Sequence, residues 1–430
     1  MNLNLENLWL PFTNNRSFKE DPLIVTRAEG NYLWSGDTKI FDGCSGLFTS
    51  PAGHRRPEIE QAIHEQLTKL DYVAPFERAH EKSAEVSTKL AGMLPSQLDR
   101  VFFTNSGSES VDTAMKMALA YHYVRGDKKR QMFVSRERAY HGVNLGGTAL
   151  SGLPKNREAF RGGLPTTLHL RHTWDPKAVF HRGQRDGGED LAYDLQRFVD
   201  LHGADAIAAC FVEPVAGSTG VLVPPKGYLQ TLREICTKNG ILLVFDEVIT
   251  GFGRIGAPFA CQEFDVMPDM ICLAKALANG VQPIGAVVAH RHVYDALMEG
   301  AEDGMIEFFH GYTWSGHPVA TAAASATLDI YENDQLFQRG QELEKPFLDE
   351  LYGLEGIRGI KDIRGYGMFG AVELEPEGTP GRRGTRLQRE LFLAGLHLKA
   401  TGDNLLLAPP MTSDIDDLKL MGDILRSVLK

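Results

Sequence analysis

Short, continuously apolar runs alternate along the middle of the chain with segments in which apolar residues recur at helical spacing. We expect strands at residues 100–104, 206–212, 241–245, 270–273 and 284–289. Helices are predicted between them, from the spacing of Val111, Ala114, Met115, Ala118 and Leu119 and over the segment 226–239, which Gly240 ends. Strands that are apolar throughout are typical of a parallel sheet whose two faces are both buried.

Buried strands separated by helices predict the α/β class, with a mainly parallel central sheet and helices on both faces. We place this larger domain at residues 60–318. From residue 319 a long helical pattern and then short strands predict a smaller α+β domain over 319–430, which the N-terminal segment 1–59 joins. Two stretches rich in Gly, Pro and charge, 183–190 and 375–384, are predicted to be surface loops.

Composition and charge narrow the classes of function. The 430 residues include 45 Lys and Arg against 56 Asp and Glu, and a net charge of −11 disfavours nucleic-acid and anionic membrane partners. The apolar runs are far shorter than the ~20 residues of a membrane helix, and the N-terminus has no signal-peptide pattern. Five cysteines without a CxxC pair favour a reducing compartment. We expect a cytoplasmic protein without a metal site, since no Cys/His cluster has zinc spacing.

Three candidate chemical groups each follow a predicted strand, at the end of the sheet where α/β proteins bind ligands. Residues 105–110 open a helix with small residues, which suits either a phosphate or a plain helix cap. Asp246 ends a buried strand, where a carboxylate needs a cationic or protonated partner. Lys275 stands between apolar neighbours, so desolvation makes it a nucleophile unless its side chain extends to the surface.

The combination of these groups is more specific than any one of them. Pyridoxal phosphate (PLP) carries a phosphate, a pyridine nitrogen that needs an anionic partner, and an aldehyde that reacts with a lysine. The sequence therefore predicts PLP as the cofactor, with Asp246 keeping the ring protonated so that it accepts electrons.

Short motifs in a fixed order extend this combination over almost the whole chain. They are Trp9-Leu-Pro-Phe12, Ser45-Gly-Leu-Phe48, Asn105-Ser-Gly-Ser-Glu109, Tyr140-His-Gly142, Glu213-Pro-Val-Ala-Gly217, Phe245-Asp-Glu-Val-Ile-Thr-Gly-Phe-Gly-Arg254, Ala274-Lys275, His310-Gly-Tyr-Thr-Trp314 and Gly402-Asp-Asn-Leu405. As a set they resemble the class III aminotransferases, and among these most resemble the β-alanine (ω-amino acid):pyruvate aminotransferases.

The resemblance implies the type I PLP-dependent transferase fold and a ping-pong transfer of an amino group. The donor would be an ω-amino acid or a primary amine, and the acceptor a keto acid, which is pyruvate in the family. Lys275 would bind the cofactor and move the proton, and Asp246 would pair with the pyridine nitrogen.

Other implied contacts surround the cofactor. Gly107 and Ser108 would bind the phosphate, Tyr140 would stack on the ring, and Val248 would pack on its opposite face, with Glu213 near the O3 side. Thr313 would reach the phosphate from the neighbouring subunit, which implies a homodimer with shared sites and leaves open whether dimers pair into tetramers. We expect a structural role for His141 and a salt-bridge role for Glu247.

Two positions depart from the family pattern and concern the donor. Lys399 stands where the ω-amino acid group usually has an Arg that binds the substrate carboxylate. Arg offers a planar two-pronged donor and Lys a flexible point charge, so carboxylate binding by Lys399 is a hypothesis. Phe48 stands where relatives often carry Trp, and the resemblance implies that it lines the substrate pocket. An alternative donor is therefore a carboxylate-free or long-chain amine.

Rival functions have weaker support in the sequence. Residues 251–256 match GxGxxG, but four residues separate them from Asp246 and Ala-Pro-Phe follows them, unlike a nicotinamide-binding turn that opens a helix. Aminomutases and racemases share the fold and much of the motif set, because a fold does not determine the reaction. The motifs at residues 9–12 and 45–48 favour an aminotransferase.

Overall fold

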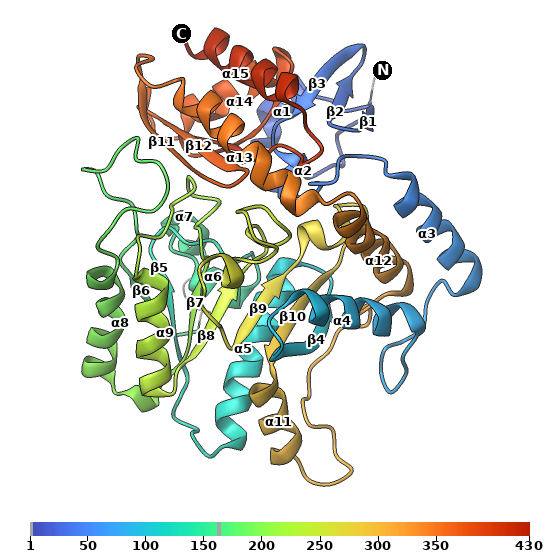
Figure 1. Ribbon diagram of the computed structural model, residues 1–430, viewed down its shortest axis with the longest axis vertical. Coiled ribbons are helices and arrows are strands. Elements are labelled where there is room, and N and C mark those ends of the chain that lie inside the picture. The colour runs from blue at the N-terminus through green and yellow to red at the C-terminus, as the bar shows by residue number, and fades with distance from the viewer. Residues whose placement is uncertain (1–2, 161–164) are drawn as a thin grey trace.

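A seven-stranded sheet forms the centre of the computed structural model, which describes residues 3–160 and 165–430; residues 1 and 2 of the predicted N-terminal segment lie outside the described residues. In spatial order its strands are β4 (Leu98–Thr104), β10 (Gly285–His290), β9 (Met270–Leu273), β8 (Leu242–Asp246), β7 (Ile207–Val212), β5 (Met132–Arg136) and β6 (Thr167–Leu170). Neighbours from β9 to β6 are parallel, whereas β10 is antiparallel to β9 and to β4. The predicted α/β class with a mainly parallel sheet is confirmed (Figure 1).

All five predicted strands are present, with ends displaced by no more than two residues. The sequence pattern does not predict β5 or β6, because polar residues limit the apolar run of each strand to three residues or fewer. Arg136 at the end of β5 is nevertheless fully buried, and its guanidinium donates a hydrogen bond of 2.7 Å to the carbonyl of Glu213. This bond offsets part of the cost of burying the charge.

Alternate residues of the central strands pack on opposite faces of the sheet. Leu243 and Phe245 belong to the apolar cluster that includes α4, α9 and α12, whereas Leu242 and Val244 belong to the cluster that includes α5 and α11. Because successive side chains of a strand point to opposite faces, a strand buried on both faces is apolar throughout. This explains why the continuous apolar runs predicted the strands so closely.

Helices cover both faces of this sheet. Those on the α5 side are α5 (Gly107–Val124), α6 (Leu145–Leu150) and α11 (Arg291–Gly300). The other face is covered by α3 (Pro57–Lys69), α4 (Glu81–Met93), α8 (Glu189–His202), α9 (Tyr228–Asn239), α10 (Ala260–Glu263) and α12 (Pro318–Asn333). A single turn, α7 (Pro154–Arg157), follows α6, and a 3-10 turn, η2 (Ala204–Ala206), precedes β7. Within the described residues, no helix combines the length and the apolar character needed to cross a membrane.

A second apolar core joins the two ends of the chain. One small sheet consists of β1 (Arg27–Glu29), β2 (Tyr32–Ser35), β3 (Thr38–Asp42) and β13 (Leu396–His397). The other consists of β11 (Ile360–Tyr366), β12 (Phe369–Leu374), β15 (Asn404–Leu407) and β14 (Lys399–Thr401). With them lie α1 (Asn15–Glu20), α13 (Leu336–Tyr352), α14 (Arg382–Leu393) and α15 (Ile415–Leu429), so both termini lie on the same side of the molecule (Figure 1). The domain boundaries themselves stay a prediction.

The two predicted loops are shorter than expected. In the segment 183–190, helix α8 already begins at Glu189, and in the segment 375–384, helix α14 begins at Arg382. Glu189 and Asp190 lie in the first turn of α8, where acidic side chains are favoured by the partial positive charge of the helix end. Their charge, which suggested a loop, also suits a helix start.

Close packing around β10 generates a stability prediction. A Cβ atom at Gly285 would lie 2.6 Å from the Thr104 hydroxyl and 2.9 Å from the Leu273 carbonyl oxygen, so Gly285→Ala must separate β10 from its neighbours. We expect this change to lower the free energy of unfolding by about 2 kcal/mol. The control is Gly92→Ala in α4, where a Cβ meets nothing within 4 Å and the change should stabilise the protein by about 0.5–1 kcal/mol. Denaturant unfolding measures both, and equal effects would contradict the packing argument.

Candidate active site

A cavity of about 490 Å³ opens where the strands β4, β7, β8 and β9 end. Residues at or just after the ends of these strands line it: residues 105–108, Glu213, Val215, Asp246, residues 248–250 and residues 274–275. Residues 280–284, which lead into the antiparallel β10, form another part of its wall. This is the position at which open α/β sheets bind ligands, because the carboxyl ends of parallel strands meet at one edge.

Lys275 extends from the turn that follows β9. It begins the 3-10 turn η3 (Lys275–Ala278) with a left-handed backbone, φ 47°, which costs a residue other than glycine about 1–2 kcal/mol. Burial lowers the pKa of its ammonium group below the ordinary value, although Asp246 and Glu213 oppose part of this effect. The larger neutral fraction makes Lys275 a better nucleophile and base than a surface lysine.

Asp246 ends β8, is buried, and lines the cavity. Nδ1 of His141 donates a hydrogen bond of 2.8 Å to its Oδ2, and the backbone N–H of Val248 donates one of 3.1 Å to its Oδ1. The predicted structural role of His141 did not anticipate this contact. Nε2 of His141 is buried and has no hydrogen-bond partner among the described residues, so this nitrogen remains free to bond a ligand or a water molecule.

The N-terminus of α5 offers an anion-binding site. Ser106 caps the helix by accepting a hydrogen bond from the N–H of Glu109, while no described residue accepts one from the N–H of Gly107 or Ser108. A Cβ at Gly107 would lie 2.9 Å from Cγ1 of Val248, so only glycine lets this backbone approach the cavity. Free N–H groups and the positive end of an 18-residue helix favour a phosphate here.

The segment around Tyr140 closes the site beside this helix end. The Glu213 carboxylate accepts hydrogen bonds of 2.9 Å from the N–H groups of Tyr140 and Gly217, and burial raises its pKa above the ordinary value. Gly142 has φ 96°, and a Cβ there would lie 2.5 Å from the Ser108 hydroxyl. Tyr140 is therefore held against α5 and lines the cavity.

The groups present match the chemical groups of PLP. The free N–H groups of Gly107 and Ser108 suit its phosphate, the buried carboxylate of Asp246 suits its protonated ring nitrogen, and the amine of Lys275 suits its aldehyde. All three lie in one cavity, so the residues that the structure describes fit this cofactor.

The structure brings most of the predicted site residues together. The lining of the cavity includes Gly107, Ser108, Tyr140, Glu213, Asp246, Val248 and Lys275. Phe48 is buried beside it, with its ring centre 6.0 Å from Nζ of Lys275. Thr313 and Lys399 do not line the cavity: Thr313 is exposed, and Lys399 begins β14. The roles of these residues in binding stay predictions.

Some residues of the site lie outside the predicted set. Thr49, Thr250 and Gln282 contribute polar groups to the cavity wall. Thr49 and Thr250 each lie within two residues of a predicted site residue, which is the signal that could have found them, whereas Gln282 lies in a loop without a recognisable motif.

The salt bridge expected at Glu247 is replaced by hydrogen bonds. Its carboxylate accepts bonds of 2.6 and 3.1 Å from the N–H groups of Ala260 and Cys261, and it forms no ion pair within the part of the chain that the structure describes. Burial raises its pKa to about 7. Glu247 therefore anchors the start of α10 and does not face the cavity.

Comparisons with known proteins agree with this site. The family model for class III aminotransferases matches residues 14–429. An omega-aminotransferase of Caulobacter vibrioides is 48% identical over 99% of this chain and 97% of its own, and a beta-alanine–pyruvate aminotransferase of Pseudomonas aeruginosa is 44% identical over 99% and 96%. A solved amine transaminase from an uncultivated Pseudomonas species, in its PLP-bound form, covers 99% of this chain and 98% of its own with a TM-score of 0.91 and 33% identity. The chain belongs to the class III aminotransferase family.

Proposed function

We propose that this enzyme transfers an amino group from an ω-amino acid or a primary amine to pyruvate, with PLP as the cofactor and by a ping-pong mechanism. The observation that carries the proposal is the common cavity of Lys275, Asp246 and the free N–H groups of Gly107 and Ser108. The choice of substrates is supported by the relatives, which include a beta-alanine–pyruvate aminotransferase of Pseudomonas aeruginosa and an omega-amino acid–pyruvate aminotransferase of Pseudomonas putida.

The chain's own residues carry the proton transfers and hold the reactants. When bound, PLP supplies an aldehyde for an amine and a ring that accepts electrons. Asp246, oriented by the N–H donors of His141 and Val248, holds a proton at the ring nitrogen. Nζ of Lys275 would take a proton from the donor carbon and pass it to the cofactor carbon that carried the aldehyde, and burial supports this role by enlarging the neutral fraction of the amine.

Further residues complete the binding site in this proposal. Tyr140 and Val248, which both line the cavity, would pack on the two faces of the ring, Glu213 would lie at its O3 side, and the N–H groups of Gly107 and Ser108 would bind the phosphate. Thr313 reaches the phosphate from the partner of a homodimer, an assignment supported by its exposure and by exposed aromatic neighbours such as Trp314. Five free, buried cysteines support a cytoplasmic location.

A second candidate concerns the donor. Among the described residues that line the cavity, Lys275 is the one Lys or Arg, and Asp246 and Glu213 add negative charge. Such a lining favours an amine without a carboxylate unless Lys399 or a partner subunit supplies a cation. Carboxylate-free amines are therefore the alternative donors.

The half-reactions decide between the donors. The absorption band of the Lys275-bound cofactor should disappear when the donor is added and return when pyruvate follows. A response to β-alanine would show that the site recognises a carboxylate, whereas a response to butylamine alone would assign the donor to the amines. A band that responds to neither compound, or is absent after reconstitution with PLP, would contradict the proposal.

Replacing the lysine should abolish the reaction. Lys275→Ala removes the amine that binds the cofactor and moves the proton, so we expect turnover to fall to background and the lysine-bound absorption band to be lost. Lys238→Ala, at an exposed position of α9, is the control and should leave both unchanged. Wild-type turnover by Lys275→Ala would exclude its assigned role.

Replacing the carboxylate should separate cofactor binding from catalysis. Asp246→Asn keeps the size of the side chain but removes the negative charge, so we expect a fall in kcat of roughly 100-fold or more with the cofactor still bound. Asp265→Asn, at an exposed turn, is the matched control. An unchanged kcat would assign the charge at the ring nitrogen to another residue.

A further inference from the structure

The segment between β3 and residue 54 has a strained backbone. It includes the short turn α2 (Ser45–Phe48), in which Ser45 and Phe48 have φ of 47° and 62° and the intervening Gly46 has φ of 67°. Left-handed backbone costs about 1–2 kcal/mol at a residue other than glycine, so contacts with the surroundings must stabilise the turn.

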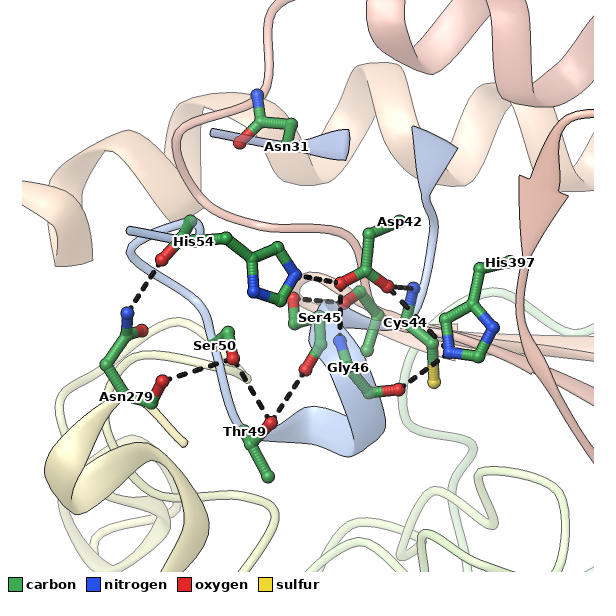
Figure 2. Close-up of polar contacts among 12 residues, drawn as sticks. Asn31, Asp42, Cys44, Ser45, Gly46, Thr49, Ser50, His54, Asn279 and His397 are labelled. Carbon is green, nitrogen blue, oxygen red and sulfur yellow. Dashed lines mark hydrogen bonds and ion pairs between the residues drawn. The ribbon is translucent and has the colours of Figure 1, made fainter. Parts of the chain in front are cut away.

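Asp42, at the end of β3, supplies the central contacts. Its carboxylate is fully buried and accepts hydrogen bonds of 2.6 Å from the N–H of Gly46, 3.3 Å from the N–H of Cys44 and 2.6 Å from Nε2 of His54 (Figure 2). Although burial alone would raise its pKa, these bonds and the nearby His397 hold the pKa of the Asp42 carboxyl below its usual value. The charged form that binds the turn is therefore the favoured one.

His397 holds the same turn from another element. Its Nε2 donates a hydrogen bond of 2.8 Å to the carbonyl of Gly46 and lies 4.0 Å from Oδ1 of Asp42. Both peptide groups of Gly46 are thus bonded, the N–H to Asp42 and the C=O to His397. We call Asp42, His54 and His397 the carboxylate brace.

A second set of hydrogen bonds connects the segment to Asn279, the residue that follows η3, the turn that begins with Lys275. Asn279 accepts a hydrogen bond of 3.0 Å from the N–H of Ala52 and donates one of 2.7 Å to the carbonyl of Gly53. Its own carbonyl accepts one of 3.1 Å from the hydroxyl of Ser50 (Figure 2). These bonds fix the position of the segment relative to Lys275, which lies four residues before Asn279.

The strained turn places an aromatic ring beside the reacting amine. The ring centre of Phe48 lies 6.0 Å from Nζ of Lys275, and the ring also packs edge-to-face with Phe369, at 5.3 Å between ring centres. Thr49, the next residue, lines the cavity. A small rotation of the turn would therefore change the space beside Lys275.

We propose that the carboxylate brace positions Phe48 and thereby sets the size of the amino donor that the enzyme accepts. Asp42, His54 and His397 are not among the lining residues of the cavity, so they are positioning residues that act through Phe48. The inference rests on the proposed function, because the space beside Lys275 must hold the amino donor in that reaction.

A double-mutant cycle on donor size tests the route through Phe48. We expect Asp42→Asn, which replaces one accepting oxygen by an N–H donor, to raise the kcat/KM ratio of 1-phenylethylamine to butylamine about ten-fold, with pyruvate as acceptor. Phe48→Ala should raise the same ratio, and adding Asp42→Asn to it should change the ratio less than about two-fold, because the residue that the brace positions is gone. An unchanged ratio in Asp42→Asn, or equal factors in both backgrounds, would overturn the proposal.

Labelling of Cys44 gives a readout that does not depend on catalysis. Cys44 lies between Asp42 and the turn, is fully buried, and has its pKa raised to about 12 by burial, so it should react slowly with iodoacetamide. Releasing the brace by Asp42→Asn or His54→Ala should accelerate labelling of Cys44 about ten-fold by peptide mass spectrometry. His54→Gln, which retains an N–H donor for Asp42, should restore slow labelling, and Asp37→Asn at an exposed turn should have no effect.

The other cysteines serve as internal controls. Cys210, Cys236, Cys261 and Cys272 are buried in the large core, and their labelling should stay slow when only the turn is released. Equal acceleration at all five would mean a general loss of folding and would overturn the positioning role. If wild-type enzyme converts neither amine and does not convert β-alanine, the proposed function fails. If the labelling of Cys44 and the donor ratio are unchanged in the variants while wild-type enzyme transaminates, the positioning role of the brace alone fails.

Discussion

The pairing of β8 with β9 is the constraint on which the rest of the site depends. Asp246, the last residue of β8, is in register with Cys272 of β9, so Lys275 follows only three residues beyond that pair. Both strands run in the same direction and are buried on both faces, which fixes the carboxylate and the amine at one edge of the sheet. A shift of one residue would turn Asp246 toward a helix layer and remove one of the two carboxylates that attract Lys275.

The free-energy cost of burying charged groups at this edge is offset by hydrogen-bond donors and by opposite charges. His141 and a backbone N–H bind Asp246, two backbone N–H groups bind Glu213, and the two carboxylates attract Lys275. Nε2 of His141 and the N–H groups at the start of α5 have no hydrogen-bond partner among the described residues. Unsatisfied polar groups destabilise a protein alone but stabilise the complex with a charged ligand, so the same atoms serve cofactor binding.

The parts that the sequence predicted are those governed by local patterns. Strands β7, β8 and β9 were visible because both of their faces are buried, and Asp246 and Lys275 follow directly from where those strands end. Strands β5 and β6 were missed because polar residues such as Ser135 and Arg136 are buried by tertiary contacts that no local pattern reveals. The reversed direction of β10, the contact of His141 with Asp246 and the carboxylate brace depend on residues far apart in the chain, and periodicity carries no information about them.

The pairing of β3 with β13 has a consequence for the order of folding. Phe41 and Asp42 pair with Leu396 and His397, so a segment near the start of the chain meets its partner strand only after almost all of the protein has been made. At synthesis rates of about 5–20 residues per second, this delay is on the order of tens of seconds. During that time the turn that carries Phe48 lacks half of its hydrogen bonds to Gly46, and the large sheet can form first. The pocket beside the lysine would then be shaped last, by a segment that left the ribosome among the first.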